Sequence, residues 1–451
     1  MYLTNIKILL DRIKYQIKKH FLFGVLSLSV SASFAQADII GKQKVILNIN
    51  GSRLKIPYFS SHDLAKSNTQ IERAVVVIHG TERNADTYYA SMMTAASMSG
   101  INLNSTIILA PQFLLEEDIN FHSLDNEHLY WSNDGWKSGS FSRIENTNPR
   151  SQRISSYAVL DTIMLRLANN LPNLKSIIFT GFSAGGQLAN RYSASTPVVD
   201  ILCSKYQIST KFVVGSPSSY LYLDNKRVVE GTKNQFAIPS TSCIEYNEWK
   251  FGLGNLFNYP ALSGAESIRN KLEKREVVYL LGENDNNPRS SSLDTTCEAM
   301  LQGKERLERG IIYFNYLKSY YGSKIINFHS LYTVPNVAHD HYGIFISKIG
   351  LFHLFQSPPT SCENLVTANP ILKKTEFLVY PNPTSNYLTV ICPLNNSSIT
   401  IFNLNGLKLF DIHHINPPNY QLNLTALAAG IYIVEYRSEN YTERKIIVKI
   451  N

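Results

Sequence analysis

The sequence is short of charge, and its charge is unevenly placed. Charged residues make up 17% of the 451 residues, although the formal net charge is +8. Residues 1–35 account for half of this net charge, with five lysines and arginines against one aspartate. The rest is spread thinly over the remaining chain, so no basic stripe is left to follow a phosphate backbone. This argues against a nucleic-acid-binding protein.

The apolar run near the N-terminus, FLFGVLSLSV, is too short to cross a membrane, because a spanning helix needs about 20 apolar residues. A basic segment ending in KKH precedes the run, and the small residues of SASFAQA follow it. This order is typical of a secretory signal peptide, which we predict for residues 1–35 with cleavage after Ala35. An uncleaved membrane anchor is the alternative. After cleavage we expect no stable membrane span.

Cysteine is scarce as well. None of the five cysteines has the CxxC spacing of a zinc site, and we predict no metal and no cofactor. In an exported protein, the four cysteines that precede the C-terminal region allow three disulfide connectivities. Proximity in the chain favours Cys203–Cys243 and Cys297–Cys362. Cys392 is then expected to be a buried strand residue.

Strands and helices alternate through most of the chain after an opening hairpin. The hairpin is predicted for KVILNINGSRLKIPYF, where Asn50 and Gly51 form the turn. Continuous β-branched runs, such as AVVVIHG (74–80) and STIILAPQ (105–112), are typical of strands buried on both faces of a parallel sheet. SSYAVLDTIMLRLANNL and YGIFISKIGLFHLF have helical periodicity. The order predicts an α/β protein with a mostly parallel, doubly wound sheet.

Two segments depart from this alternation. Residues 224–274 are rich in Asn, Tyr, Phe and Gly without a sustained period, and we predict a lid or an irregular insertion near the site. Residues 357–376 contain Pro-Pro and Asn-Pro pairs and are predicted to be a linker. The linker would separate a catalytic domain, residues 36–356, from short alternating strands in residues 377–451. Those strands predict a small all-β sandwich.

A glycine-flanked serine is the strongest chemical signal in the chain. Gly181-Phe182-Ser183-Ala184-Gly185 stands between a predicted strand and a predicted helix. Such a turn forces the serine into a strained backbone geometry, and glycines on either side remove side chains that would clash. Ser183 is therefore the candidate nucleophile. The amide of Ala184, at the helix N-terminus, is the first candidate donor of an oxyanion hole.

A serine hydroxyl needs a general base. His339 follows the last predicted strand and precedes the last predicted helix, and we predict that it is the base. His341 is a rival two residues further on, and His329 lies inside the strand.

The base needs a carboxylate to orient it. Asp285 follows the predicted strand VVYLLGE and is our choice, with Glu283 in reserve and Asp224 as a third option. The chain order Ser183, Asp285, His339 is that of the α/β-hydrolases.

The second oxyanion donor is expected from the loop after AVVVIHG. A glycine turn at Gly80 would leave the amide of Thr81 facing the serine, and His79 is expected to support the loop rather than react. Among the aromatic residues, Tyr88, Trp131 and Trp136 either line a substrate cleft or simply pack beside the sheet.

Residues 74 to about 354 resemble a carboxylic-ester hydrolase of the α/β-hydrolase fold. HGTERNADTYY is similar to the oxyanion loop of secreted feruloyl esterases and polyhydroxyalkanoate depolymerases, and GFSAGGQLANRY is similar to their nucleophile elbow. The resemblance implies a Ser-His-Asp triad that cleaves a small or polymeric carboxylic ester through an acyl-enzyme. The stretch from GSPSSYLYLD to TTCEAMLQGKERLERG departs from this resemblance, because it does not match a substrate pocket of these enzymes. A serine peptidase on the same fold and a non-catalytic surface binding protein are the alternatives.

The C-terminal region has a resemblance of its own. VYPNPTSNYLTV, ITIFNLNGLKL, LAAGIYIVEY and KIIVKI are similar to the type IX (Por) secretion C-terminal sorting domain. This implies export through the inner and then the outer membrane of a Gram-negative bacterium, with the type IX machinery as partner. The protein would then be released or attached to the cell surface. A carbohydrate-binding or adhesive sandwich is the alternative.

Overall fold

The computed structural model describes residues 36–49, 51–362, 377–391, 397–403, 406–415, 419–438 and 441–450. The predicted signal peptide, Asn50, Cys392 and most of the predicted linker lie outside these residues. None of the helices in the described ranges combines the length and the apolar character that a membrane crossing requires. The α/β part and the all-β part are described separately below.

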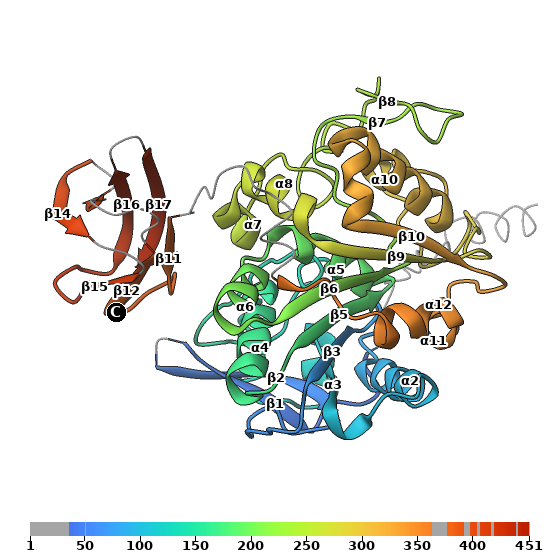
Figure 1. Cartoon of the computed structure of the whole chain (residues 1–451), viewed down its shortest axis with the longest axis horizontal. Coiled ribbons are helices and arrows are strands. Elements are labelled where there is room, and N and C mark those ends of the chain that lie inside the picture. The colour runs from blue at the N-terminus through green and yellow to red at the C-terminus, as the bar shows by residue number, and fades with distance from the viewer. Residues whose placement is uncertain are drawn as a thin grey trace, which may run out of the picture. The chain divides into compact units, whose positions relative to one another are not determined.

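An eight-stranded sheet forms the centre of the α/β part (Figure 1). Its strands follow the order β1-β2-β4-β3-β5-β6-β9-β10. Their bounds are β1 Gln43–Ile49, β2 Ser52–Ser60, β3 Arg73–Ile78, β4 Thr106–Pro111, β5 Ser176–Phe182, β6 Ser209–Gly215, β9 Glu276–Gly282 and β10 His329–Val334. The hairpin β1–β2 is antiparallel and joins β4 antiparallel, whereas every pair from β4 to β10 is parallel. This is the α/β-hydrolase fold that the sequence predicts.

Successive residues of the central strands point into two different cores. In β3, Ala74, Val76 and Ile78 belong to one cluster of buried side chains, and Val75 and Val77 belong to the other. Alternating residues face opposite sides of a strand, so an uninterrupted apolar run serves both sides. The prediction that these strands are buried on both faces is confirmed.

Helices cover both faces of the sheet. The larger core is closed by α4 Ser156–Asn170, α5 Ala184–Ser195, α6 Val198–Tyr206, α8 Ala265–Lys274 and α10 Arg306–Tyr321. The smaller core is closed by α2 Ala85–Met98, α11 His341–Ile346 and α12 Lys348–Leu351. Shorter described elements are α3 Glu116–Phe121, β7 Arg227–Val228, β8 Phe236–Ala237, α7 Asn258–Ser263, α9 Cys297–Met300, the 3₁₀ turns Leu103–Ser105 and Ser323–Asn327, and a π-helical turn Phe352–Gln356.

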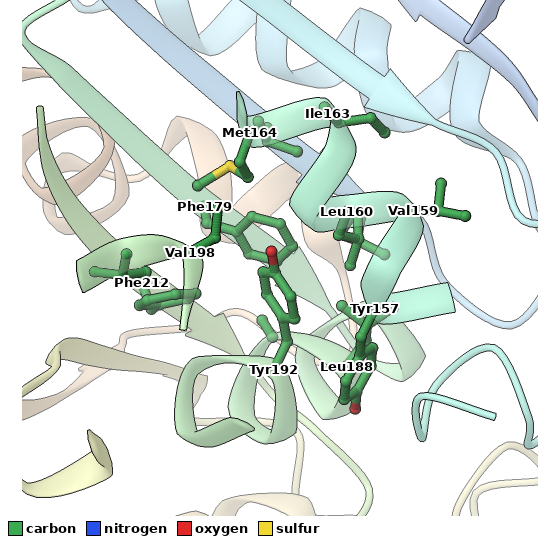
Figure 2. Packing of buried hydrophobic residues seen from close by; sticks show 14 of the residues in the cluster. Tyr157, Val159, Leu160, Ile163, Met164, Phe179, Leu188, Tyr192, Val198 and Phe212 are labelled. Atoms are coloured by element: carbon green, nitrogen blue, oxygen red, sulfur yellow. The ribbon is translucent and has the colours of Figure 1, made fainter. Parts of the chain in front are cut away.

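Figure 2 shows how the larger core fills the space between α4 and the strands. Phe179 of β5 lies 5.0 Å from Tyr192 of α5 and 5.6 Å from Phe212 of β6, measured between ring centroids. Leu160 of α4 is completely buried in the same cluster. Truncating such a residue to alanine costs about 2–5 kcal/mol, because the surroundings do not fully close the cavity. This packing fixes α5 on the sheet, and α5 begins at the residue after Ser183.

The single helix predicted for YGIFISKIGLFHLF is wrong. The chain forms α11, α12 and the π-helical turn instead. Ser347 separates α11 from α12 because its backbone is extended, with φ −62° and ψ 154°, and its side chain accepts a hydrogen bond from the amide of Gly350. Helical periodicity continues across the break because both helices bury their apolar sides in the same core.

Residues 224–274 form an ordered insertion. It contains the short β7–β8 pair and ends in α7 and α8. The indole nitrogen of Trp249 donates to the carbonyl of Ser138 at 2.9 Å, so this insertion packs against residues 132–140. Its role as a lid stays a prediction.

The disulfide pairing predicted from proximity in the chain is wrong. The bonds are Cys203–Cys362 and Cys243–Cys297, with Cα–Cα separations of 5.5 and 5.9 Å. The first bond joins residues 159 positions apart, because the sheet brings α6 beside the segment that follows the π-helical turn. Sequence distance does not report this kind of neighbourhood.

The all-β part consists of two antiparallel sheets. Their strands are β11 Leu378–Tyr380, β12 Tyr387–Ile391, β13 Ser397–Asn403, β14 Lys408–Ile415, β15 Asn419–Asn423, β16 Gly430–Ser438 and β17 Tyr441–Lys449. One sheet has the order β11-β12-β15, and the other has the order β14-β13-β16-β17. Leu388 and Leu422 of the first sheet share one buried cluster with Ile401, Val434 and Ile447 of the second. The predicted sandwich is confirmed.

Candidate active site

Ser183 lies at a sharp turn between β5 and α5. Its φ of +58° and ψ of −117° belong to a region that residues with a Cβ rarely adopt, at a cost of about 1–3 kcal/mol. A Cβ on Gly181 would lie 2.4 Å from the carbonyl oxygen of Gly185, and one on Gly185 would lie 2.3 Å from that of Ile78. The amide of Ser183 donates to the carbonyl of Gly215 at 2.9 Å. Both glycines are therefore required, and β6 holds the strained turn in place.

A chain of two hydrogen bonds links the three residues that the sequence singled out. The Oγ atom of Ser183 lies 2.9 Å from Nε2 of His339, and Nδ1 of His339 lies 2.7 Å from Oδ2 of Asp285. Asp285 accepts, so Nδ1 carries the proton and Nε2 is free to accept from the serine hydroxyl. The side chains of Asp285 and His339 are 4% and 22% exposed, so the acid is buried and the base is partly open to solvent.

The loops that carry the acid and the base are joined through their backbones. Asp285 follows β9, and His339 follows the neighbouring parallel strand β10. The amide of Asn284 donates to the carbonyl of Val337 at 2.9 Å, and the amide of Glu283 donates to that of Val334. Parallel strands end at the same edge of a sheet, which is why residues distant in sequence meet here.

The rival bases have other partners. His341 is stacked on Tyr88 with ring centroids 4.1 Å apart, and its Nε2 lies 3.1 Å from Oγ of Ser91. His329 is buried inside β10, where its Nε2 donates to the carbonyl of Leu272 at 2.8 Å. Burial lowers the pKa of His329 to about 4. Neither side chain is hydrogen-bonded to Ser183.

The rival acids also lie elsewhere. Glu283 accepts a hydrogen bond from the hydroxyl of Thr333 at 2.9 Å. Asp224 accepts one from the phenol of Tyr316 at 3.0 Å. Of the three carboxylates considered, Asp285 is the one in contact with His339.

His79 supports the predicted oxyanion loop from behind. It is completely buried, its Nε2 accepts from the amide of Phe113 at 3.0 Å, and its Nδ1 donates to the carbonyl of Gly80 at 2.8 Å. Burial lowers the pKa of His79 to about 4, so the ring is neutral. The C=O and N–H groups of a trans peptide point in opposite directions. Holding the Gly80 carbonyl toward His79 therefore turns the amide of Thr81 away from it.

A buried ion pair, which the sequence did not reveal, fixes the same loop. The Nε atom of Arg83 lies 2.6 Å from Oδ2 of Asp118, and both side chains are fully buried. Arg83 also donates to the carbonyl of Thr81 at 2.9 Å. Asp118 accepts further bonds from the amides of Leu115 and Ala37, at 2.8 and 2.7 Å. Buried charges need such partners, so this network fixes the position of the loop.

The three aromatic candidates for substrate binding are packed inside the protein. Trp131 and Trp136 are 1% and 0% exposed. Trp136 is stacked on Phe113 and lies 4.7 Å from His79 between ring centroids, so it supports the oxyanion loop. Tyr88 is 3% exposed and carries His341 on its face. Their burial favours the packing alternative over an open cleft.

A cavity of about 320 Å³ lies between residues 132–140 and residues 245–257. Asp134 on its wall bridges Lys137 and Lys250, each at 2.8 Å. The carbonyl of Lys250 accepts from Arg191 of α5, which places the cavity beside the helix that starts at the serine turn. A larger cavity of about 410 Å³ lies at the opposite edge of the sheet, at the amino ends of β3 and β5, away from Ser183.

Residues 378–449 match the family described as the secretion system C-terminal sorting domain. This part of the chain is a sorting domain. It indicates export by type IX secretion, so the protein is secreted or lies at the cell surface. Among the solved structures, one similar to this chain is that of PorZ, described as a surface component of the type-IX secretion system of Porphyromonas gingivalis. That likeness has 18% identity and a TM-score of 0.15, and covers 17% of this chain and 11% of that chain.

Solved structures that are similar to the α/β part include two hydrolases. One is poly(aspartic acid) hydrolase-1 from Sphingomonas sp. KT-1, with 21% identity, a TM-score of 0.43, and coverage of 67% of this chain and 96% of that chain. The other is LpqC, a poly(3-hydroxybutyrate) depolymerase from Bordetella parapertussis, with 16% identity, a TM-score of 0.45, and coverage of 73% and 96%. A comparison with curated proteins found no match.

Proposed function

We propose that this protein is an exported serine hydrolase that cleaves carboxylic esters. The observation that carries the proposal is the hydrogen-bond chain from Ser183 through His339 to Asp285, set at a strained turn. Strain of this kind persists only where the surrounding structure maintains it, and it concentrates at functional sites.

In the proposed reaction, the hydroxyl of Ser183 attacks the ester carbonyl while His339 takes its proton at Nε2. The bond from Nδ1 of His339 to Asp285 holds the ring in the required tautomer and stabilises the imidazolium that forms. When the tetrahedral intermediate collapses, the imidazolium gives the proton to the departing alcohol. Water then repeats the sequence on the acyl-enzyme, releasing the acid and restoring Ser183.

The developing oxyanion would be bound by the amides of Ala184 and Thr81. Ala184 is the first residue of α5, where the helix dipole favours negative charge. His79 and Arg83 hold the two carbonyls that flank the Thr81 amide, so that its direction is fixed before substrate arrives. None of these steps draws on a metal or a cofactor.

The same proposal covers the organisation of the chain. We infer that residues 1–35 direct the protein across the inner membrane and that residues 377–451 are recognised by the type IX machinery at the outer membrane. Residues 36–356 would then be the catalytic domain and residues 357–376 the linker.

The test is active-site labelling of the full chain with a serine-directed fluorophosphonate, followed by intact mass spectrometry. Ser183→Ala is compared with Ser91→Ala, which removes a second buried hydroxyl that also faces a histidine, His341. We expect one adduct on the wild type and on Ser91→Ala, and none on Ser183→Ala. A library of esters and peptides then distinguishes an esterase from a peptidase. A folded wild type that takes up no label and cleaves no substrate would contradict the proposal.

A further inference from the structure

Helix α10 helps to position the acid of the site, Asp285. Helix α10 begins at Arg306, and the amide of Leu307 in its first turn donates to the backbone carbonyl of Asp285 at 3.2 Å. The Nη1 atom of Arg306 lies 3.6 Å from Oδ1 of Asp285. The two carboxylate oxygens of Asp285 are therefore divided between two partners, His339 on Oδ2 and Arg306 on Oδ1.

Arg306 is itself held firmly. Its side chain is 1% exposed, and its Nε donates to the hydroxyl of Ser218 at 3.0 Å. Its Nη2 donates to the hydroxyl of Ser292 at 3.0 Å, and its Nη1 donates to that of Ser290 at 3.3 Å. These partners come from the loop after β6 and the loop after β9. A planar guanidinium with several fixed donors positions a carboxylate in a way that a single ammonium group cannot.

We propose that Arg306 is a positioning residue, which aligns Asp285 with His339 and keeps His339 neutral at lower pH than the Asp–His pair alone would. A cation beside Asp285 stabilises the carboxylate in its ionised form. The same cation disfavours a positive charge on His339. It also offsets part of the negative potential of the carboxylate, which would otherwise stabilise the imidazolium. Both effects favour the neutral imidazole, which is the form that accepts a proton. The catalytic part of this inference rests on the proposed esterase function.

The other groups that face the pair do not replace Arg306. Tyr220, from the loop after β6, interacts electrostatically with Asp285, and burial keeps its phenol neutral by raising its pKa well above the ordinary value. Glu305 opposes Arg306, because it is a carboxylate near Asp285, and burial raises its pKa. His341 interacts with His339, and burial lowers the pKa of His341. In the described part of the chain, Arg306 is the cation in contact with Asp285.

The test compares Arg306→Gln, Arg306→Lys and the matched control Arg309→Gln in the full chain. Arg309 lies one turn further along α10, is equally buried, and donates to the carbonyls of Gly303 and Asp294. The pKa of His339 is read by NMR of ¹³C-labelled histidine, with the resonance assigned through His339→Asn. The pH dependence of kcat/KM is read in parallel on the best ester.

For Arg306→Gln we expect the pKa of His339, and the acid limb of kcat/KM, to rise by about 0.5–1 pH unit. Arg306→Lys keeps the charge and should leave the limb within about 0.3 unit while kcat falls at least threefold, because alignment is lost. Arg309→Gln should not shift the acid limb of kcat/KM. If Arg306→Gln does not fold, the acid limb of kcat/KM and the kcat of Arg306→Lys test the inference in its place.

Three results would overturn the inference. The first is an unchanged pKa of His339 in folded Arg306→Gln, and the second is an equal shift of that pKa in Arg309→Gln. The third is an Arg306→Lys variant that moves the acid limb of kcat/KM by a full pH unit, or that leaves both the acid limb and kcat unchanged. A wild type that neither labels nor cleaves any ester contradicts the proposed function alone, because the pKa of His339 is measured without turnover.

Discussion

Gly282 and Val337 meet backbone to backbone, and this contact sets the spacing between the acid and the base. A Cβ on Gly282 would lie 2.4 Å from the carbonyl oxygen of Val337 and 2.6 Å from that of Ala338. Asp285 lies three residues after Gly282, and His339 lies two residues after Val337. The 2.7 Å bond between Asp285 and His339 therefore depends on a glycine that takes no part in it.

The first prediction is that Gly282→Ala lowers kcat by about 10- to 100-fold while the protein stays folded. The added methyl group must push the two loops apart, and a misplacement of 1 Å at a catalytic site costs on the order of 100-fold in rate. The measurement is kcat on the best ester beside the circular dichroism of the variant. Gly430→Ala is the control, because a Cβ there meets only ordinary contacts at 3.6 Å. An unchanged kcat in Gly282→Ala would show that the loops tolerate the displacement.

The strand ends and the serine turn could be predicted from the sequence, because their signals are local. Gly181, Ser183 and Gly185 mark a turn that only glycine permits at two positions. Asp285 and His339 each follow a predicted strand, and the parallel sheet brings those strand ends together. No contact between the chosen residues had to be known in advance.

The buried arginines that support the site could not be predicted, because their partners are distant in the sequence. Arg83 reaches Asp118 across 35 positions, and Arg306 reaches Asp285 across a loop and a short helix. Buried arginines have no sequence signature apart from their charge, which more often indicates a surface residue. The cysteine pairing failed for the same reason, since Cys203 and Cys362 become neighbours only when the sheet has formed.

The second prediction concerns the buried pair behind the oxyanion loop. Asp118→Asn removes the charge that faces Arg83, and breaking a buried pair in this way costs about 3–5 kcal/mol of unfolding free energy. The activity should fall as well, because Arg83 also holds the carbonyl of Thr81. Urea unfolding followed by fluorescence measures the loss. The exposed pair of Glu72 with Lys175 is the control, for which Glu72→Gln should cost less than about 1 kcal/mol. Equal losses in the two variants would contradict this view of Arg83.

The third prediction concerns the longer disulfide. Removing Cys203–Cys362 by a double substitution to serine frees a loop with a sequence separation of 159. The chain-entropy treatment gives a loss of about 5 kcal/mol, which we take as an upper limit, because removing a native disulfide typically costs about 2–5 kcal/mol. Thermal unfolding with and without reductant measures the effect. In the double variant, reductant should lower the melting temperature only through Cys243–Cys297. A double variant as stable as the wild type would mean that the Cys203–Cys362 bond does not contribute to the unfolding free energy.

The fourth prediction is that stability falls as the pH is lowered from about 6.5 toward 4, in part because of His329. Its pKa is lowered to about 4 by burial, whereas an unfolded histidine titrates near 6.5, so between these values the unfolded chain binds the extra proton. Above pH 6.5 the histidine is neutral in both states and does not lower the unfolding free energy. As the pH falls toward 4, the unfolding free energy decreases by up to about 3 kcal/mol. His329→Gln should therefore flatten the pH dependence of the urea midpoint while lowering stability at pH 7. His413→Gln is the control, since the side chain of His413 is 63% exposed. If the wild type and His329→Gln lose stability in parallel between pH 6.5 and 4, the acid sensitivity arises elsewhere, and His79, which is equally buried with a pKa of about 4, is the next histidine to replace.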